Sequence, residues 1–360
     1  MGYTREEKTI IWLDSFLSLD YARKVKISAL CKGLFELVSD FPRYKRAVSQ
    51  IAGEGVCAEM ERSLDSFRYL EELLCSYARK GIFCITYYSD SYPVSLKEID
   101  NPPLVLYCKG NKQLLSDWRK LAIVGSRRTS ANILKLTEEF SAALGEAFTI
   151  VTGIADGADT AAIRGALPCG KIISVLANGF DHVYPECNRN LLDKIIESGL
   201  VVTEYPPAIL PHKYNFPVRN RIIAGLSDGV LVVSGRLKSG TRHTAKYAFE
   251  YGREVFAFPY NIGAESGAVC NNIIKEGGKL VENLVDISAA FGIHLTEKEE
   301  IPLNETEREI LELLRRGEAH IGELSKITGK KIYELQPVLV SLEMKRRVAD
   351  CGGNRYCAIK

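Results

Sequence analysis

Apolar residues near the start of the chain recur at spacings of three and four. This spacing is clearest at Ile10, Ile11, Leu13, Phe16 and Leu17. Two further amphipathic runs cover residues 22–41 and 60–79. Such spacing gathers apolar side chains on one face of a helix. We therefore predict an N-terminal helical domain over residues 1–82, and we find no cluster of catalytic residues in it.

The pattern changes after residue 83, where short apolar runs alternate with helical stretches. The runs are residues 121–124, 148–151, 172–176, 200–202, 230–233 and 255–258. They are apolar on both faces, as strands of a sheet covered on both sides must be. The predicted crossover helices include residues 132–144, 160–167 and 241–251. This alternation predicts an α/β domain over residues 83–290, with a doubly wound, Rossmann-like parallel sheet.

A third pattern occupies residues 302–360. Three helical stretches are predicted there, at residues 305–316, 321–328 and 332–345. Two short runs follow on either side of Gly352-Gly353-Asn354, a sequence typical of a hairpin turn. Three helices followed by a hairpin indicate a winged-helix domain. The charged residues 295–301 are predicted to be the linker before it.

Charge and composition exclude several classes of protein. Lys and Arg number 47 and Asp and Glu number 45, so the net charge is only +2. A polyanionic partner must therefore be attracted by local clusters of charge. The apolar runs are too short to cross a membrane, and the N-terminus carries acids unlike an export signal. The ten cysteines are scattered without a C-x-x-C pair, which is typical of reduced thiols. We expect a cytoplasmic protein with no membrane partner.

Glycine-rich loops follow four of the predicted strands. Because the carboxyl ends of parallel strands meet at one edge of a sheet, we expect these loops to form one groove. Glycine lets the backbone approach a ligand, and helix N-termini favour anions. The candidate phosphate-binding residues in these loops are Gly125, Ser126, Arg127, Gly153, Gly157, Lys238, Ser239, Gly240 and Thr241.

A local excess of positive charge coincides with these loops. Residues 206–253 hold eight basic and two acidic side chains, within a protein that is nearly neutral. Inside this stretch, Arg219, Asn220 and Arg221 are predicted to open a helix and to add cationic side chains to its free N–H groups. A solvated basic face would have the same composition. The coincidence with the glycine loops favours a groove for anions.

Familiar cofactor and catalytic motifs do not fit. Of the three glycines in a dinucleotide fingerprint, Gly125 alone is present after the first predicted strand. Residues 235–241 nearly match a P-loop, but Thr241 stands where the lysine belongs. The sequence holds neither an H-E-x-x-H zinc helix nor a G-x-S-x-G nucleophile elbow. We predict no catalytic residues, no metal and no cofactor.

Five sequence blocks resemble the DNA-processing protein A family, also called DprA or Smf. The blocks are residues 123–127, 157–162, 184–185, 216–224 and 239–241. Of these, the F-P-V-R-N-R-I-I-A block at 216–224 is the most specific. The resemblance runs over residues 85–281, and the three-part layout also fits, with a SAM-like or helix-hairpin-helix-like N-terminal domain.

The resemblance implies a non-enzymatic protein that binds single-stranded DNA and loads the RecA recombinase during natural transformation. It also implies a homodimer formed through the Rossmann-like domain. Carried over by motif, phosphates would be held by Ser126, Arg127, Arg219, Asn220, Arg221 and the Ser239-Gly240-Thr241 loop. The chain departs from the family pattern at Thr152, Asp156, Ile163, Glu186 and Tyr260. The two acids among these are expected to weaken DNA binding.

Two other functions remain open. Phosphoribohydrolases of the same superfamily use a glutamate in a G-G-x-G-T-x-x-E loop, and Thr244 would occupy that position here. Because a hydroxyl cannot replace the carboxylate, we expect no nucleotide hydrolysis. The winged helix raises the possibility of a transcription factor, but residues 332–345 offer Gln336, Lys345 and little else to base edges. An accessory or docking module is the favoured interpretation.

Overall fold

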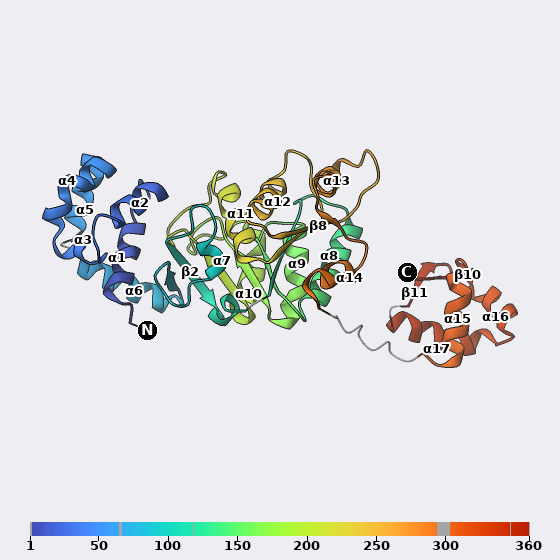
Figure 1. Cartoon of the computed structure of the whole chain (residues 1–360). Helices are drawn as coiled ribbons and strands as arrows, with labels where there is room; N and C mark the ends of the chain where they lie inside the picture. Colours follow the sequence, from blue (N-terminus) through green and yellow to red (C-terminus); the bar gives the residue numbers. More distant parts are fainter. Residues whose placement is uncertain (1, 65–66, 118, 294–302, 346, 360) are drawn as a thin grey trace. The chain divides into compact units, whose positions relative to one another are not determined.

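The computed structural model describes the chain except for residues 1, 65–66, 118, 294–302, 346 and 360, and gives the backbone alone for residues 67–69 and 344. The chain forms two compact units, Met1–Leu295 and Thr296–Lys360 (Figure 1). The boundary predicted at residue 82 falls inside the first unit. The linker predicted at 295–301 lies outside the described residues.

The N-terminal part of the first unit is helical, as predicted. Its helices are α1 (Arg5–Asp14), α2 (Tyr21–Ser28), α3 (Glu36–Ser39), α4 (Phe41–Ala52), α5 (Glu54–Leu64) and α6 (Phe67–Arg79). Thr4 begins α1 with a reciprocal capping box to Glu7. Ile10 and Leu13 of α1 belong to the same buried cluster as Tyr107 of the sheet. The helices therefore share a core with the sheet.

A nine-stranded sheet follows. Its strands are β1 (Phe83–Thr86), β2 (Val105–Gly110), β3 (Lys120–Val124), β4 (Thr149–Thr152), β5 (Ile172–Val175), β6 (Leu200–Thr203), β7 (Gly229–Val232), β8 (Glu254–Ala257) and β9 (Lys279–Leu280). Their order is β1-β2-β6-β5-β4-β3-β7-β8-β9. The six predicted strands correspond to β3–β8 and are parallel to one another. The sheet is mixed, however, because β1 and β2 pair antiparallel.

Helices cover both faces of this sheet. They are α7 (Val94–Lys97), α8 (Ala131–Leu144), α9 (Ala158–Ala166), α10 (Arg189–Ser198), α11 (Asn215–Leu226), α12 (Gly240–Glu250), α13 (Ala268–Lys275) and α14 (Leu284–Ser288). Residues of α8, α9, α10 and α14 join one buried cluster, and residues of α7, α11, α12 and α13 join another. Two clusters on opposite faces confirm the doubly wound prediction. Among the described residues, none of the helices is long and apolar enough to span a membrane.

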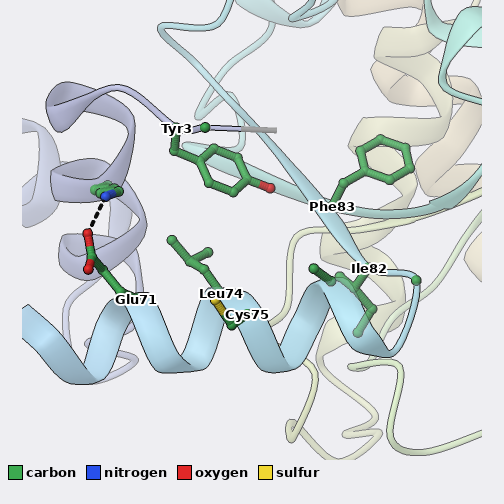
Figure 2. Close-up of a pocket in the computed structure, with 10 residues that line it drawn as sticks. Tyr3, Glu71, Leu74, Cys75, Ile82 and Phe83 are labelled. Carbon is green, nitrogen blue, oxygen red and sulfur yellow. Dashed lines mark hydrogen bonds and ion pairs between the residues drawn. The ribbon is translucent and has the colours of Figure 1, made fainter.

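The edge strand β1 is covered by the N-terminal segment. The Tyr3 hydroxyl accepts a hydrogen bond from the Cys84 amide at 2.7 Å, and Ser89 Oγ accepts one from the Thr86 amide at 3.0 Å. Figure 2 shows the Tyr3 ring between α6 and β1, beside a cavity of about 480 Å³. An ion pair of 2.5 Å between Lys8 and Glu71 lies at the same cavity.

The second unit is a winged helix. Its elements are α15 (Glu305–Arg315), β10 (Ala319–His320), α16 (Ile321–Thr328), α17 (Ile332–Met344), β11 (Val348–Gly352) and β12 (Arg355–Ala358). Buried Glu307 accepts hydrogen bonds from Ser341 at 2.6 Å and from Lys345 at 2.7 Å. Lys345, which the sequence offered as a reader of base edges, is therefore engaged inside its own domain.

Candidate phosphate-binding groove

The groove lies where the strand order of the sheet reverses. The chain proceeds from β3 to β6 in one direction and then returns to place β7 on the other side of β3. Loops that follow β3 and β7 meet α11 and the start of α12 around a cavity of about 420 Å³. Ligands of open α/β sheets commonly bind at such a reversal. We call this cavity the switch-point groove.

Most of the predicted site residues line this groove. They are Gly125, Ser126, Arg127, Arg219, Asn220, Ser239, Gly240 and Thr241. The groove is also lined by side chains that were not among the sequence candidates, notably Arg128, Phe216 and Arg236. Phe216 opens the 216–224 block, Arg128 directly follows the 123–127 block, and Arg236 lies in the basic stretch 206–253. Their closeness in sequence to the predicted site residues was the signal that could have identified them.

Exposed cations and aromatic rings form the mouth of the groove. The Arg127 guanidinium lies 5.2 Å from the centre of the Phe216 ring. That ring packs against Tyr184 with a centroid distance of 5.5 Å, and Tyr184 is 40% exposed. Arg236 is also exposed and faces Glu265 at 3.7 Å, too long for a strong pair. The mouth therefore presents positive charge beside a short aromatic stack.

The floor of the groove holds two buried charged groups. Arg219 is 6% exposed and donates hydrogen bonds to the Val175 carbonyl and, at 3.2 Å, to Asn220 Oδ1. Asp159 accepts from the Ala155 amide at 3.2 Å. Burial raises the pKa of Asp159, and the nearby Arg219 guanidinium opposes that shift. Burial likewise lowers the pKa of Arg219. The floor therefore holds a cation and a carboxylate close together in fixed positions.

Two of the predicted glycines serve packing within the protein. A Cβ on Gly153 would lie 2.3 Å from Asp159 Oδ2 and 2.7 Å from Arg219 Nη1. Gly157 has φ +83°, and its Cβ would lie 2.6 Å from the carbonyl oxygens of Ser126 and Arg127. Both glycines lie outside the groove lining. The expectation that they bring backbone to a ligand is therefore corrected: they let neighbouring loops and side chains approach one another.

The start of α12 offers an unused hydrogen-bonding group. Ser239 is the N-cap residue, and within the described chain its hydroxyl is buried without a hydrogen-bond partner. Asn220 Nδ2 donates to the Gly240 carbonyl at 3.2 Å and thereby fixes this loop against α11. A hydroxyl and a helix N-terminus together suit a phosphate oxygen.

The Arg219–Arg221 block differs from its prediction in two ways. First, α11 begins at Asn215, so this block lies in the second turn and not at the free N–H groups. Pro217 is compatible with the earlier start because the first turn does not need its missing N–H. Second, Arg221 forms an ion pair with Glu204 and lines a different cavity. Lys238 is exposed beside the groove but outside its lining.

Comparison with models of protein families shows to which family the chain belongs. The family model for DNA recombination-mediator protein A matches residues 83–292, more than half of the 360 residues, and the DprA winged helix domain model matches residues 296–354. The chain belongs to the DprA family. This confirms the resemblance drawn from the motifs.

Individual DprA relatives agree with this assignment. The DNA processing protein DprA of Bacillus subtilis is 40% identical over 223 residues, which cover 61% of this chain and 74% of that protein. The X-ray structure of DprA from Streptococcus pneumoniae is similar with a TM-score of 0.68 and 33% identity, over 82% of this chain and 100% of that one. A structure of DprA from Helicobacter pylori is described for its single-stranded DNA binding mode. It is similar with a TM-score of 0.54 and 29% identity, over 59% of this chain and 97% of that one.

The departures from the usual DprA motifs lie outside the groove lining. Asp156 accepts from Asn188 Nδ2 at 3.2 Å, and Glu186 pairs with Arg189 at 2.6 Å. Tyr260 donates to the Val233 carbonyl at 2.7 Å. Thr244 does line the groove and is 1% exposed. Thr244 therefore places a buried hydroxyl where the phosphoribohydrolases have their glutamate.

Proposed function

We propose that this DprA-family chain binds single-stranded DNA by its phosphates in the switch-point groove. The observation that carries the proposal is the convergence of Arg127, Arg128 and Arg236 around the groove that also holds the unpartnered Ser239 hydroxyl. Guanidinium groups form strong hydrogen bonds with phosphate. Aromatic rings at the mouth suit stacking by bases that are not paired in a duplex. The Helicobacter relative supports the choice of ligand.

We further propose the finer features that the family implies. These are loading of RecA onto the bound strand during natural transformation and a homodimer formed by the Rossmann-like domain. Sedimentation of the purified protein tests the dimer. RecA assembly on strands carrying this protein, compared with bare strands, tests the loading.

We propose that the groove is not catalytic. Of the groups that line it in the described chain, Asp159 is the carboxylate, and it lies buried beside Arg219. Thr244 cannot act as a general acid or base at neutral pH. Release of free base from a panel of nucleoside monophosphates would contradict this and would favour the phosphoribohydrolase alternative.

The main experiment measures binding of a labelled single strand by fluorescence anisotropy across a salt series, with duplex as competitor. Arg127→Ala should weaken binding about tenfold and make the dependence of log K on log salt shallower by about 0.7, as expected when one phosphate contact is lost. Arg46→Ala is the matched control, because Arg46 is an exposed arginine on α4. Equal effects of the two variants would overturn the proposal.

A further inference from the structure

A second cavity lies on the other side of α11 from the switch-point groove. It encloses about 480 Å³ between α2, the Pro102-Pro103 segment, the end of β6 and α11. We call it the α2–α11 pocket and define it by Tyr21, Lys24, Glu204, Tyr205, Val218 and Arg221. Its volume is in the range of small-ligand sites, about 300–1,000 Å³.

Two polar atoms in this pocket lack partners. Arg221 Nη2 bonds to Glu204 Oε2, but Arg221 Nη1 and Glu204 Oε1 are buried and make no hydrogen bond within the described chain. Buried polar groups in proteins nearly always have a partner, so each exception calls for an explanation. This pair offers one donor next to one acceptor.

The charge of the pocket argues against a second phosphate site. Its lining holds three acids, Asp14, Asp20 and Glu204, against two cations. One of these cations, Lys24, is held by Asp14 at 2.9 Å. A phosphate entering here would meet a net negative wall. An uncharged ligand with adjacent acceptor and donor groups fits better.

The remaining walls favour a flat ring. Tyr21 and Tyr205 line the pocket, and Leu17 at its rim is 53% exposed. Every nucleobase carries a hydrogen-bond donor beside an acceptor on its pairing edge and has a face that stacks on aromatic side chains. A nucleobase that is not paired would therefore satisfy both Glu204 Oε1 and Arg221 Nη1.

The helix α11 connects this pocket to the groove. Phe216 and Arg219 line the groove, whereas Val218 and Arg221 line the pocket. Tyr214, just before α11, is 73% exposed, and Val218 is 42% exposed. A helix with its side chains is about 10–12 Å across. A single strand held in the groove has to cross only this width to place a base in the α2–α11 pocket.

From this arrangement we propose that the α2–α11 pocket is a second DNA subsite, which takes one unstacked nucleobase of a strand whose phosphates occupy the switch-point groove. The proposal rests on the proposed function. It gives Arg221 a role in base recognition and separates that role from the phosphate contacts of Arg127.

The test compares a normal single strand with an abasic strand of equal length and charge. Val218→Trp fills the rim of the pocket from an exposed position, and Leu17→Trp does so from the opposite wall. We expect each to weaken binding of the normal strand about tenfold, the size of one lost stacking contact, and to leave the abasic strand unchanged. Val285→Trp is the control, because Val285 is 64% exposed on α14.

The outcomes separate this proposal from the proposed function. Equal losses on both strands, or no loss on the normal strand in either folded variant, would overturn the base subsite alone. If the wild-type protein binds neither strand, the proposed function fails as well. Circular dichroism of each variant verifies that it is folded.

Discussion

Arg219 and Arg221 stand two residues apart on one helix and meet opposite surroundings. Arg219 faces the switch-point groove, near the exposed cations of its mouth. Arg221 faces the α2–α11 pocket, where Glu204 binds it directly. The sequence counts both as equal members of a basic stretch. The comparison teaches that a basic stretch of sequence does not predict which cavity each cation serves: Arg219 lies beside the buried Asp159 at the groove, and Arg221 binds Glu204 at the pocket.

The largest effect should come from removing Arg221. The substitution Arg221→Ala leaves Glu204 buried without its cation, which costs about 3–5 kcal/mol of the free energy of unfolding. Chemical denaturation measures this loss. Combining Arg221→Met with Glu204→Gln should recover most of it. A stable Arg221→Ala protein would contradict the difference drawn between the two arginines.

A smaller loss is expected at the floor of the groove. Gly153→Ala places a methyl group against Asp159 and Arg219, and overpacking of this kind costs about 1–3 kcal/mol. Gly240→Ala is the control, since its Cβ would meet its nearest atom only at 4.0 Å. Thermal unfolding of the two variants should differ clearly. Equal stability would mean that the floor adjusts easily.

Acid pH extends the comparison to two buried glutamates. Burial alone would raise the pKa of Glu307, but hydrogen bonds from Lys345 and Ser341 outweigh it and lower this pKa from 4.5 to about 2. Its contribution to stability is present above pH 4.5 and is lost as the pH falls from 4.5 towards 2. Burial raises the pKa of Glu204 above 4.5, so its contribution has the opposite sign: it is present below pH 4.5 and is lost as the pH rises above that value.

NMR signals of the winged helix should follow this acid transition. Glu307→Gln should flatten the pH dependence of the stability of the winged-helix unit. Substitution of the exposed Glu309, as Glu309→Gln, should leave that dependence unchanged. A pH profile of the Glu307→Gln variant that matches wild type would contradict the assignment.

The smallest effect is predicted for the acids that depart from the family pattern. Asp156→Asn and Glu186→Gln should raise affinity for single-stranded DNA less than about threefold, because exposed charges outside the groove are screened by salt. Anisotropy at low and high salt measures the change. A gain as large as the Arg127→Ala loss would show that the strand passes over these acids.

Much of the fold was accessible from the sequence. The strands β3–β8 are within one residue of their predictions, because strands buried on both faces are continuous apolar runs. The strands β1, β2 and β9 were missed. One face of β2 shares a buried cluster with helices of the N-terminal part, a tertiary contact that no local pattern reveals.

The candidate site was predicted less completely. Motifs located Arg127 and Ser239, which project from loops after strands. They could not tell that Gly153 and Gly157 face protein atoms, since a glycine is required equally by a ligand and by a neighbouring loop. Nor could they separate Arg219 from Arg221, because the partner of Arg221 comes from the end of β6.

The covering of β1 by Tyr3 and Ser89 has a consequence for self-assembly. The Cys84 and Thr86 amides on the open side of β1 are both occupied by these side chains. An edge strand with free amides is a template on which another chain can add a strand. Proteolytic loss of the segment before α1 would expose the Cys84 amide. We therefore expect loss of the first few residues to make the protein more prone to aggregation through this edge of the sheet.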